Sequence, residues 1–160
     1  SVPGWDPSRH RRPPLQPLAP RAAAQQSAPV HVHPVDIYYE DTDFSGVVYH
    51  ANYLRYFERA REHLLGRNEL VRLWHEGNVG FVVYKATLEY KEGARFGDTL
   101  EIRTTVQLAS PFRAVFDQQA WRPGGDKPLV KAEIELCCVG AQQTLVPLPD
   151  VVRRRLAPPA

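Results

Sequence analysis

The chain has 160 residues, which is the length of one domain, and it contains 43% hydrophobic and 24% charged residues. This composition excludes an intrinsically disordered chain, and the absence of an apolar run of about 18 residues predicts no membrane span. The net charge is only +2, and residues 31–160 carry 16 basic against 17 acidic side chains. Because a nucleic-acid partner requires a basic surface, no such partner is predicted.

Residues 1–30 differ in composition from the rest of the chain. They hold seven of the 15 prolines and four arginines against one aspartate, and they show no hydrophobic period. Because closely spaced prolines prevent a continuous helix, we predict a disordered arm over 1–30. A folded domain is predicted over 31–140, followed by a C-terminal tail over 141–160 that can form a short helix at 149–156.

The first predicted elements are a strand and a long helix. Val35, Ile37 and Tyr39 alternate with polar or amphipathic residues, which is typical of a half-buried strand with Tyr39 pointing inward. After a polar turn at 41–46, apolar residues recur at intervals of four, three and four over 53–64, which predicts an amphipathic helix. Gly66 is expected to end this helix, and a shorter helix is predicted over 69–76.

Four further strands are predicted over 81–90, 99–108, 112–121 and 130–139. Short turns join them, so the sheet is expected to be antiparallel, with the long helix lying across it in an α+β fold. Cys137 and Cys138 are neighbours in the last strand and therefore point to opposite faces. They are expected to be free thiols, which indicates a reducing compartment.

The segment 39–53 carries the chemistry. It joins the first strand to the long helix, where carboxylates can lie beside unpaired N–H groups at the positive end of a helix dipole. This pairing suits acyl transfer, because the N–H groups stabilise an oxyanion while a carboxylate attacks or activates water. The spacing Asp41-x-Asp43-x-Ser45-Gly46 also opens a calcium loop, but its twelfth position is Asn52 instead of Glu.

The run YYEDTDFSGVVYHANYLRYFERAR resembles the hotdog-fold acyl-CoA thioesterases of the 4-hydroxybenzoyl-CoA thioesterase type. It is most similar to the bacterial group associated with the Tol–Pal genes, the YbgC-like group. The resemblance continues through FVVYKATLEYKEGARFGDTLEIRT and weakens after about residue 140. It implies a five-stranded antiparallel sheet wrapped around one long helix, in homodimers or homotetramers of a cytoplasmic bacterial enzyme. It implies no metal or cofactor, since coenzyme A arrives as part of the acyl-CoA substrate.

The resemblance also implies roles for individual residues. Asp43 is the catalytic carboxylate, as nucleophile or as general base, and the backbone N–H at His50 polarises the thioester carbonyl. Tyr39 and the ring of His50 complete the catalytic set. Residues expected to bind substrate are Tyr49, Asn52, Tyr53 and Phe81.

Each of these residues also has a structural interpretation. Asp43 can be a turn residue, His50 can act through its backbone alone, and Tyr39 can belong to the core. Asn52 can be the helix N-cap or an organiser of the site. The aromatic residues can line an acyl tunnel or simply fill the core.

Charged residues outside the motif leave further alternatives open. Glu58 can serve as a helix-borne base, although Arg61 and Glu62 favour a solvated charged face. Lys85, Lys91 and Arg95 can meet the phosphates of coenzyme A or be solvated. His31 and His33 share one strand face and can bind a metal, but a role at the strand entry is favoured.

Two other functions compete with hydrolysis. One is hotdog hydratase or dehydratase chemistry on acyl thioesters, which expects a different spacing from the six residues between Asp43 and His50. The other is a non-enzymatic interaction protein that uses the proline-rich arm as a ligand.

Overall fold

The computed structural model describes residues 29–156, so the arm expected at the N-terminus lies outside the described residues except for 29 and 30. The element bounds are β1 His31–Asp36, η2 Tyr39–Asp41, α1 Asn52–Leu65, α2 Arg67–Gly77, β2 Gly80–Tyr90, β3 Thr99–Ser110, β4 Arg113–Trp121, β5 Pro128–Val139, η3 Ala141–Gln143, β6 Leu145–Val146 and α3 Asp150–Leu156.

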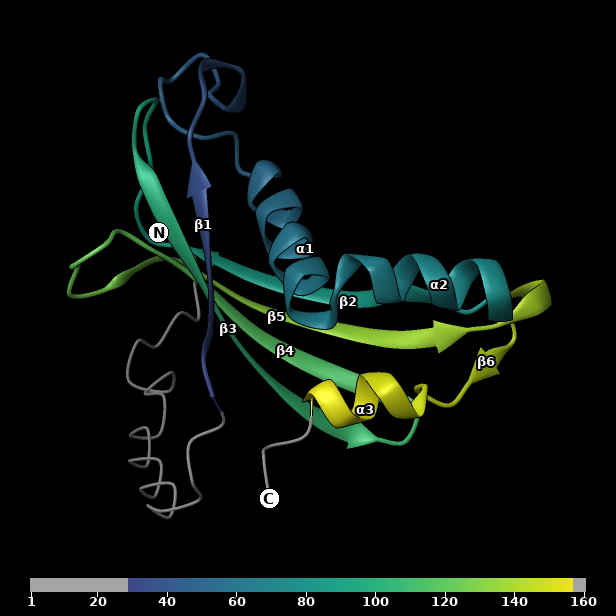
Figure 1. Cartoon of the computed structure of the whole chain (residues 1–160). Helices are drawn as coiled ribbons and strands as arrows, with labels where there is room; N and C mark the ends of the chain where they lie inside the picture. The colour runs from purple at the N-terminus through teal and green to yellow at the C-terminus, as the bar shows by residue number, and fades with distance from the viewer. Residues whose placement is uncertain (1–28, 157–160) are drawn as a thin grey trace, which may run out of the picture.

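The strands form one antiparallel sheet in the order β1-β3-β4-β5-β2, which curves around α1 (Figure 1). This confirms the predicted α+β hotdog fold. The sheet has six strands instead of five, because the two-residue β6 pairs with the end of β5. In the described part of the chain, no helix is long and apolar enough to cross a bilayer.

The core lies between α1 and the concave face of the sheet. Tyr53, Phe57 and Ala60 on α1 are fully buried, as their spacing predicted. Leu100 and Phe116 on the facing strands are also buried, which follows from the alternation of inward and outward side chains. The helix is therefore held by apolar burial along one stripe. Cys137 and Cys138 are free thiols, as expected.

Arg61 corrects the expectation of a solvated charged face on α1. The residue is only 7% exposed, and its Nη1 donates to Gln118 Oε1 at 2.8 Å. Gln118 Nε2 in turn donates to the carbonyl of Phe57 at 3.0 Å and to Thr104 Oγ1 at 3.1 Å. A buried polar network thus ties α1 to β3 and β4.

The C-terminal segment packs onto the domain. The helix α3 occupies the stretch where a short helix was expected, and it contacts α1 and β3. Its residues Val152 and Leu156 are buried, as is Leu148 just before it. Residues beyond 140 therefore contribute to the hydrophobic core.

Three histidines meet where α1 crosses β1. The rings of His33 on β1 and His63 on α1 stack with centroids 4.3 Å apart. Burial, and then the proximity of His63, lowers the pKa of His31 and of His33; His31 and Arg59 lower that of His33 further. In the described residues, no group of three or more His, Cys, Asp or Glu side chains is arranged to hold a metal ion.

This cluster predicts that the protein loses stability in mild acid. Because the folded pKa values of His31 and His33 lie below the unfolded value of about 6.5, the unfolded chain takes up protons first as the pH falls. We expect a lower Tm at pH 5.5 than at pH 7.5. This decrease in Tm should be smaller in His63→Gln, because one cause of the lowered pKa values is then removed. The matched control is His75→Gln, an exposed histidine of α2, and an unchanged loss in His63→Gln would contradict the explanation.

Candidate active site

The loop between η2 and α1 closes on itself. Thr42 forms a β-bridge with Val48 across it. Inside this bridge Asp43 N–H donates to the carbonyl of Val47, and Gly46 N–H donates to that of Asp43, both at 2.9 Å. Gly46 has a φ of +82°, a left-handed conformation that glycine adopts without strain. Asp43 is therefore fixed at the start of a tight turn.

The carboxylate of Asp43 is ionised at neutral pH. Its Oδ1 accepts from Ser45 Oγ at 2.5 Å and from Ser45 N–H at 2.8 Å. These hydrogen bonds lower the pKa of Asp43, first through the hydroxyl and then through the N–H, with a smaller effect from nearby His50. Across the described residues, Oδ2 accepts no hydrogen bond, so one oxygen is available to a water or a substrate.

Asp41 anchors this loop to α1. Its Oδ2 accepts from Tyr38 N–H at 2.7 Å, and its carbonyl accepts from Tyr49 N–H and from Asn52 Nδ2, both at 2.9 Å. The N-cap interpretation of Asn52 is wrong, because Ala51 holds that position and no side chain there accepts from a helix N–H. The side chain of Asn52 organises the site by tying the start of α1 to Asp41.

A cavity of about 330 Å³ opens beside the turn. It is lined by Asp43, Val47, Val48, His50, Tyr53, Tyr90, Lys91, Glu92 and Gly93. The structure therefore brings together three of the predicted site residues: Asp43, His50 and Tyr53. Burial is the main cause of the raised pKa of Tyr53, so its phenol is neutral here.

Tyr90 is a site residue that the sequence analysis missed. Its hydroxyl donates to the carbonyl of His50 at 3.0 Å, and its ring packs edge-on against His50 at 6.0 Å and Tyr53 at 5.9 Å. Burial raises its pKa, so the hydroxyl keeps its proton. The only signal in the sequence is that Tyr90 ends a strand directly before a polar turn.

The loop after β2 lies close against the catalytic turn. A Cβ on Gly93 would be only 2.8 Å from Val47 Cγ1, so any larger residue would push the two segments apart. The carbonyl of Ala94 accepts from Val48 N–H at 2.9 Å. Ala94 N–H also points to the hydroxyl of Tyr53 at 3.4 Å. These contacts form one wall of the cavity.

The other predicted residues lie outside this lining. Tyr39 does not point inward: β1 ends at Asp36, and Tyr39 starts the η2 turn with 79% of its surface exposed. Tyr49 is half exposed and packs against His50 at 4.6 Å. Phe81 lies at the opposite end of β2 from Tyr90, where it pairs with Cys138.

The backbone before α1 offers donors to the cavity. In the described chain, the N–H of His50 donates to no carbonyl or side chain, whereas the neighbouring Tyr49 N–H is bonded to Asp41. His50 precedes the first residue of α1 by two positions, where the helix dipole is positive. Such an N–H can stabilise negative charge on a substrate oxygen.

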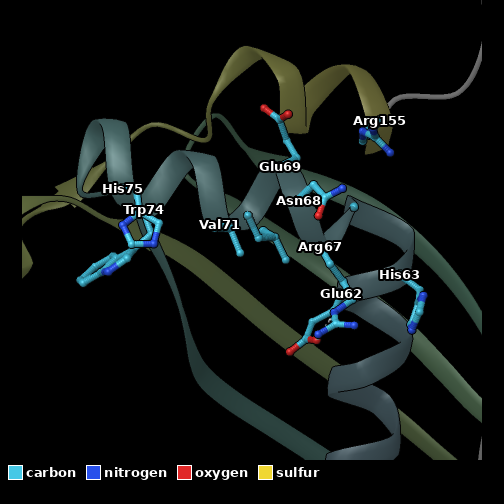
Figure 2. A pocket seen from close by; sticks show the side chains of 11 residues that line it. Glu62, His63, Arg67, Asn68, Glu69, Val71, Trp74, His75 and Arg155 are labelled. Carbon is cyan, nitrogen blue, oxygen red and sulfur yellow. Dashed lines mark ion pairs between the residues drawn. The ribbon is translucent and has the colours of Figure 1, made fainter.

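A larger hollow, of about 1000 Å³, lies elsewhere, between α1 and α2 (Figure 2). It contains none of the motif residues. Charged side chains of α1 and α2 line this hollow. Trp74 and His75 of α2 lie at one end of it, and Arg155 of α3 lies at the other. Glu69 is paired with Arg72, and Glu62 lies 3.9 Å from Arg67.

The comparisons with known proteins agree with this geometry. The model of the thioesterase-like superfamily matches residues 38–156. The chain belongs to this superfamily. The match runs past residue 140, where the resemblance was expected to weaken, and includes α3. Membership makes the chain a thioester hydrolase.

Two curated relatives share this segment. The acyl-CoA thioester hydrolase YbgC of Escherichia coli O6:H1 is 42% identical over 108 residues, which are 66% of this chain and 79% of that protein. The acyl-CoA thioesterase YbgC of Haemophilus influenzae is 38% identical over 108 residues, 66% of this chain and 78% of that one. These relatives place the chain with the YbgC-like proteins.

A solved structure shows the same fold. The 1,4-dihydroxy-2-naphthoyl-CoA thioesterase of Synechocystis superposes with a TM-score of 0.74 at 23% identity, covering 80% of this chain and 96% of that one. At this identity the similarity concerns the fold alone. A probable thioesterase of Bartonella henselae superposes with a TM-score of 0.69 at 29% identity, covering 76% of this chain and 100% of that one.

Proposed function

We propose that this protein hydrolyses acyl-CoA thioesters to free acid and coenzyme A in the cavity beside Asp43. The observation that carries the proposal is the pairing of an ionised carboxylate that has one unbonded oxygen with the unpaired N–H of His50 at the same cavity. The relatives named as acyl-CoA thioesterases support this substrate class.

Two mechanisms are consistent with this arrangement. As a general base, Asp43 takes a proton from water while the hydroxide adds to the carbonyl carbon. As a nucleophile, its carboxylate adds directly and forms an anhydride that water then hydrolyses. In both, the His50 N–H stabilises the oxyanion until the C–S bond breaks, and the departing thiolate takes up a proton. Because a thiolate is a good leaving group, no strong acid is needed.

A thiol-release assay tests the activity. It measures coenzyme A set free from short, long and aromatic acyl-CoAs. We expect turnover with at least one class, and thiol release from none of them would refute the proposal. Turnover in H₂¹⁸O can identify the nucleophilic route. If water opens the anhydride at the carbonyl of Asp43, ¹⁸O enters that side chain, whereas a general base never exchanges its oxygens.

We also propose that β2 pairs with β2 of a second copy. β2 is an edge strand, and its Val82, Val83 and Tyr84 are exposed, so an unpaired edge and apolar side chains occur together. An antiparallel two-fold pairing centred on Lys85, the middle of the strand, sets Phe81 of one copy beside Glu89 of the other. Phe81 would then approach the cavity of the partner, next to Tyr90.

The expected mass in solution is therefore at least that of a dimer. Light scattering at micromolar concentration measures it, and Val83→Asp is expected to shift the protein toward monomer because it places a carboxylate without a partner in the apolar seam between the two strands. The matched control is Val32→Asp on β1, the other edge strand, which should leave the mass unchanged. A monomeric wild-type protein would overturn the pairing.

A further inference from the structure

Tyr90 links the end of β2 to the backbone of His50. Its hydroxyl donates to the His50 carbonyl at 3.0 Å, and both residues line the cavity beside Asp43. In the described chain, no other side chain forms a hydrogen bond with the backbone of His50. A phenol at the end of a strand therefore holds the segment that carries the proposed oxyanion donor.

That segment is a tight turn over residues 49–52. The carbonyl of Tyr49 accepts from Asn52 N–H at 2.9 Å, and Ala51 has φ −70° and ψ −20°, which is the geometry of a type I turn with His50 and Ala51 at its centre. The peptide between Tyr49 and His50 is trans, so its N–H points the opposite way from its carbonyl. Because the carbonyl is bonded toward the start of α1, the His50 N–H points away from the helix and has no partner among residues 29–156.

Two different segments hold this turn from its two sides. On one side the carbonyl of Asp41 accepts from Tyr49 N–H and from Asn52 Nδ2, both at 2.9 Å, which ties the turn to the catalytic loop. On the other side the hydroxyl of Tyr90 ties the turn to the sheet. Without the Tyr90 bond, the turn would be free to shift relative to the cavity wall at the end of β2, and the His50 N–H would shift with it.

The hydroxyl of Tyr90 can be removed without removing its ring. The ring packs edge-on against those of His50 and Tyr53, and these contacts do not involve the hydroxyl. Tyr90 is 48% exposed, so water can reach the His50 carbonyl once the hydroxyl is gone, and no buried acceptor is left unpaired. Loss of the hydroxyl therefore loosens the turn and leaves the fold intact.

We propose that Tyr90 is a positioning residue for thioester hydrolysis: its hydroxyl holds the 49–52 turn so that the His50 N–H faces the carbonyl oxygen of the substrate. The proposal rests on the thioesterase function above. Tyr90 acts through His50 and transfers no proton, because its O–H is directed at the His50 carbonyl. Its contribution grows as negative charge develops on the substrate oxygen, so it lowers the barrier and leaves ground-state binding unchanged.

The first test is Tyr90→Phe, assayed by thiol release from the best acyl-CoA. We expect kcat to fall about tenfold and KM to stay within about twofold, since a small displacement of an oxyanion donor affects the transition state most. Tyr38→Phe is the matched control, because Tyr38 is also an exposed tyrosine but lies outside the cavity lining, and it should change neither constant. A kcat within about twofold of the wild type in Tyr90→Phe, or a rise in KM alone, would overturn the proposal.

A second test removes the His50 N–H itself. Proline fits the first central position of a type I turn and has no N–H, so His50→Pro deletes the donor, whereas His50→Ala keeps it. Tyr90→Phe is expected to lower kcat about tenfold in the His50→Ala background and to have no effect in the His50→Pro background. Equal losses in the two backgrounds would show that Tyr90 does not act through this N–H, which contradicts the proposal.

Two further measurements separate positioning from other roles of the hydroxyl. The kcat of Tyr90→Phe should keep the pH dependence of the wild type at a lower level, and a lost limb of the profile would assign proton transfer to Tyr90 instead. The Tm should lie within about 5 °C of the wild type, and a larger decrease would assign a structural role instead. Failure of the proposed function gives a different result, because the wild type would then release thiol from no acyl-CoA.

Discussion

Replacing Asp43 with asparagine is expected to lower kcat by about 100-fold or more, the scale of losing a general base or nucleophile, while KM changes little. The amide keeps the shape of the side chain, and its oxygen can still accept the two hydrogen bonds from Ser45. The negative charge is lost, so neither attack on the carbonyl nor proton transfer from water can occur. Thiol release from the best acyl-CoA measures the effect.

Two further variants test whether the loss of kcat in Asp43→Asn comes from the lost carboxylate or from a general change in structure. Asp126→Asn removes the charge of an aspartate in the β4–β5 turn, outside the cavity lining, and should leave kcat unchanged. His50→Ala should cost less than Asp43→Asn, because its backbone N–H survives the change. The circular dichroism spectrum and the particle mass of each variant must match those of the wild type, so that only folded proteins of the same assembly are compared. If Asp43→Asn works at close to the wild-type rate, the assigned mechanism is wrong, and Glu58 on the exposed side of α1 becomes the next carboxylate to test.

Local patterns were sufficient to predict the main elements and the α+β class, and the family resemblance supplied the hotdog arrangement. The four-three-four spacing of Tyr53, Phe57 and Ala60 with Leu64 placed α1 correctly, because helical periodicity decides which side chains a single helix can bury. The turn at 123–125 likewise separated two strands that are paired in the structure. β6 was missed because a two-residue strand has no period and exists only through its pairing with β5.

Predictions that depended on extending a local pattern failed. Alternation from Val35 and Ile37 suggested that Tyr39 faces inward, but the chain leaves the strand at Asp36 and turns. Asn52 matched the composition of an N-cap, yet its amide bonds a carbonyl 11 residues away. Neither the direction of Tyr39 nor the bond of Asn52 can be found from neighbouring residues, since both depend on how the loop folds back.

The site was predicted where the motif is contiguous and missed where it is not. Asp43 and His50 lie in one loop, so their meeting at a cavity follows from a short chain. Tyr90 and Gly93 join them only through the pairing of β2 with β5, which carries the loop after β2 to the catalytic turn. A single sequence contains no signal for that distance.

The buried network around Arg61 leads to the second large effect. Gln118→Leu is expected to lower the free energy of unfolding by about 3–5 kcal/mol, because it leaves the guanidinium buried without its acceptor. Burial lowers the pKa of Arg61, but arginine stays charged at neutral pH, so the cost cannot be avoided by losing a proton. The carbonyl of Phe57 and the hydroxyl of Thr104 lose a donor at the same time.

A double-mutant cycle shows whether the pairing itself is responsible. Arg61→Met together with Gln118→Leu replaces both partners with apolar groups of similar length, so the double variant should regain most of the stability that Gln118→Leu loses. Urea unfolding at one fixed protein concentration measures all three variants, and Gln107→Leu, at an exposed glutamine of β3, should change stability by less than about 0.5 kcal/mol. If the losses of the two single variants simply add in the double variant, Arg61 and Gln118 are not coupled. The network would then contribute no more than its separate side chains, and the position of α1 on the sheet would depend on apolar burial alone.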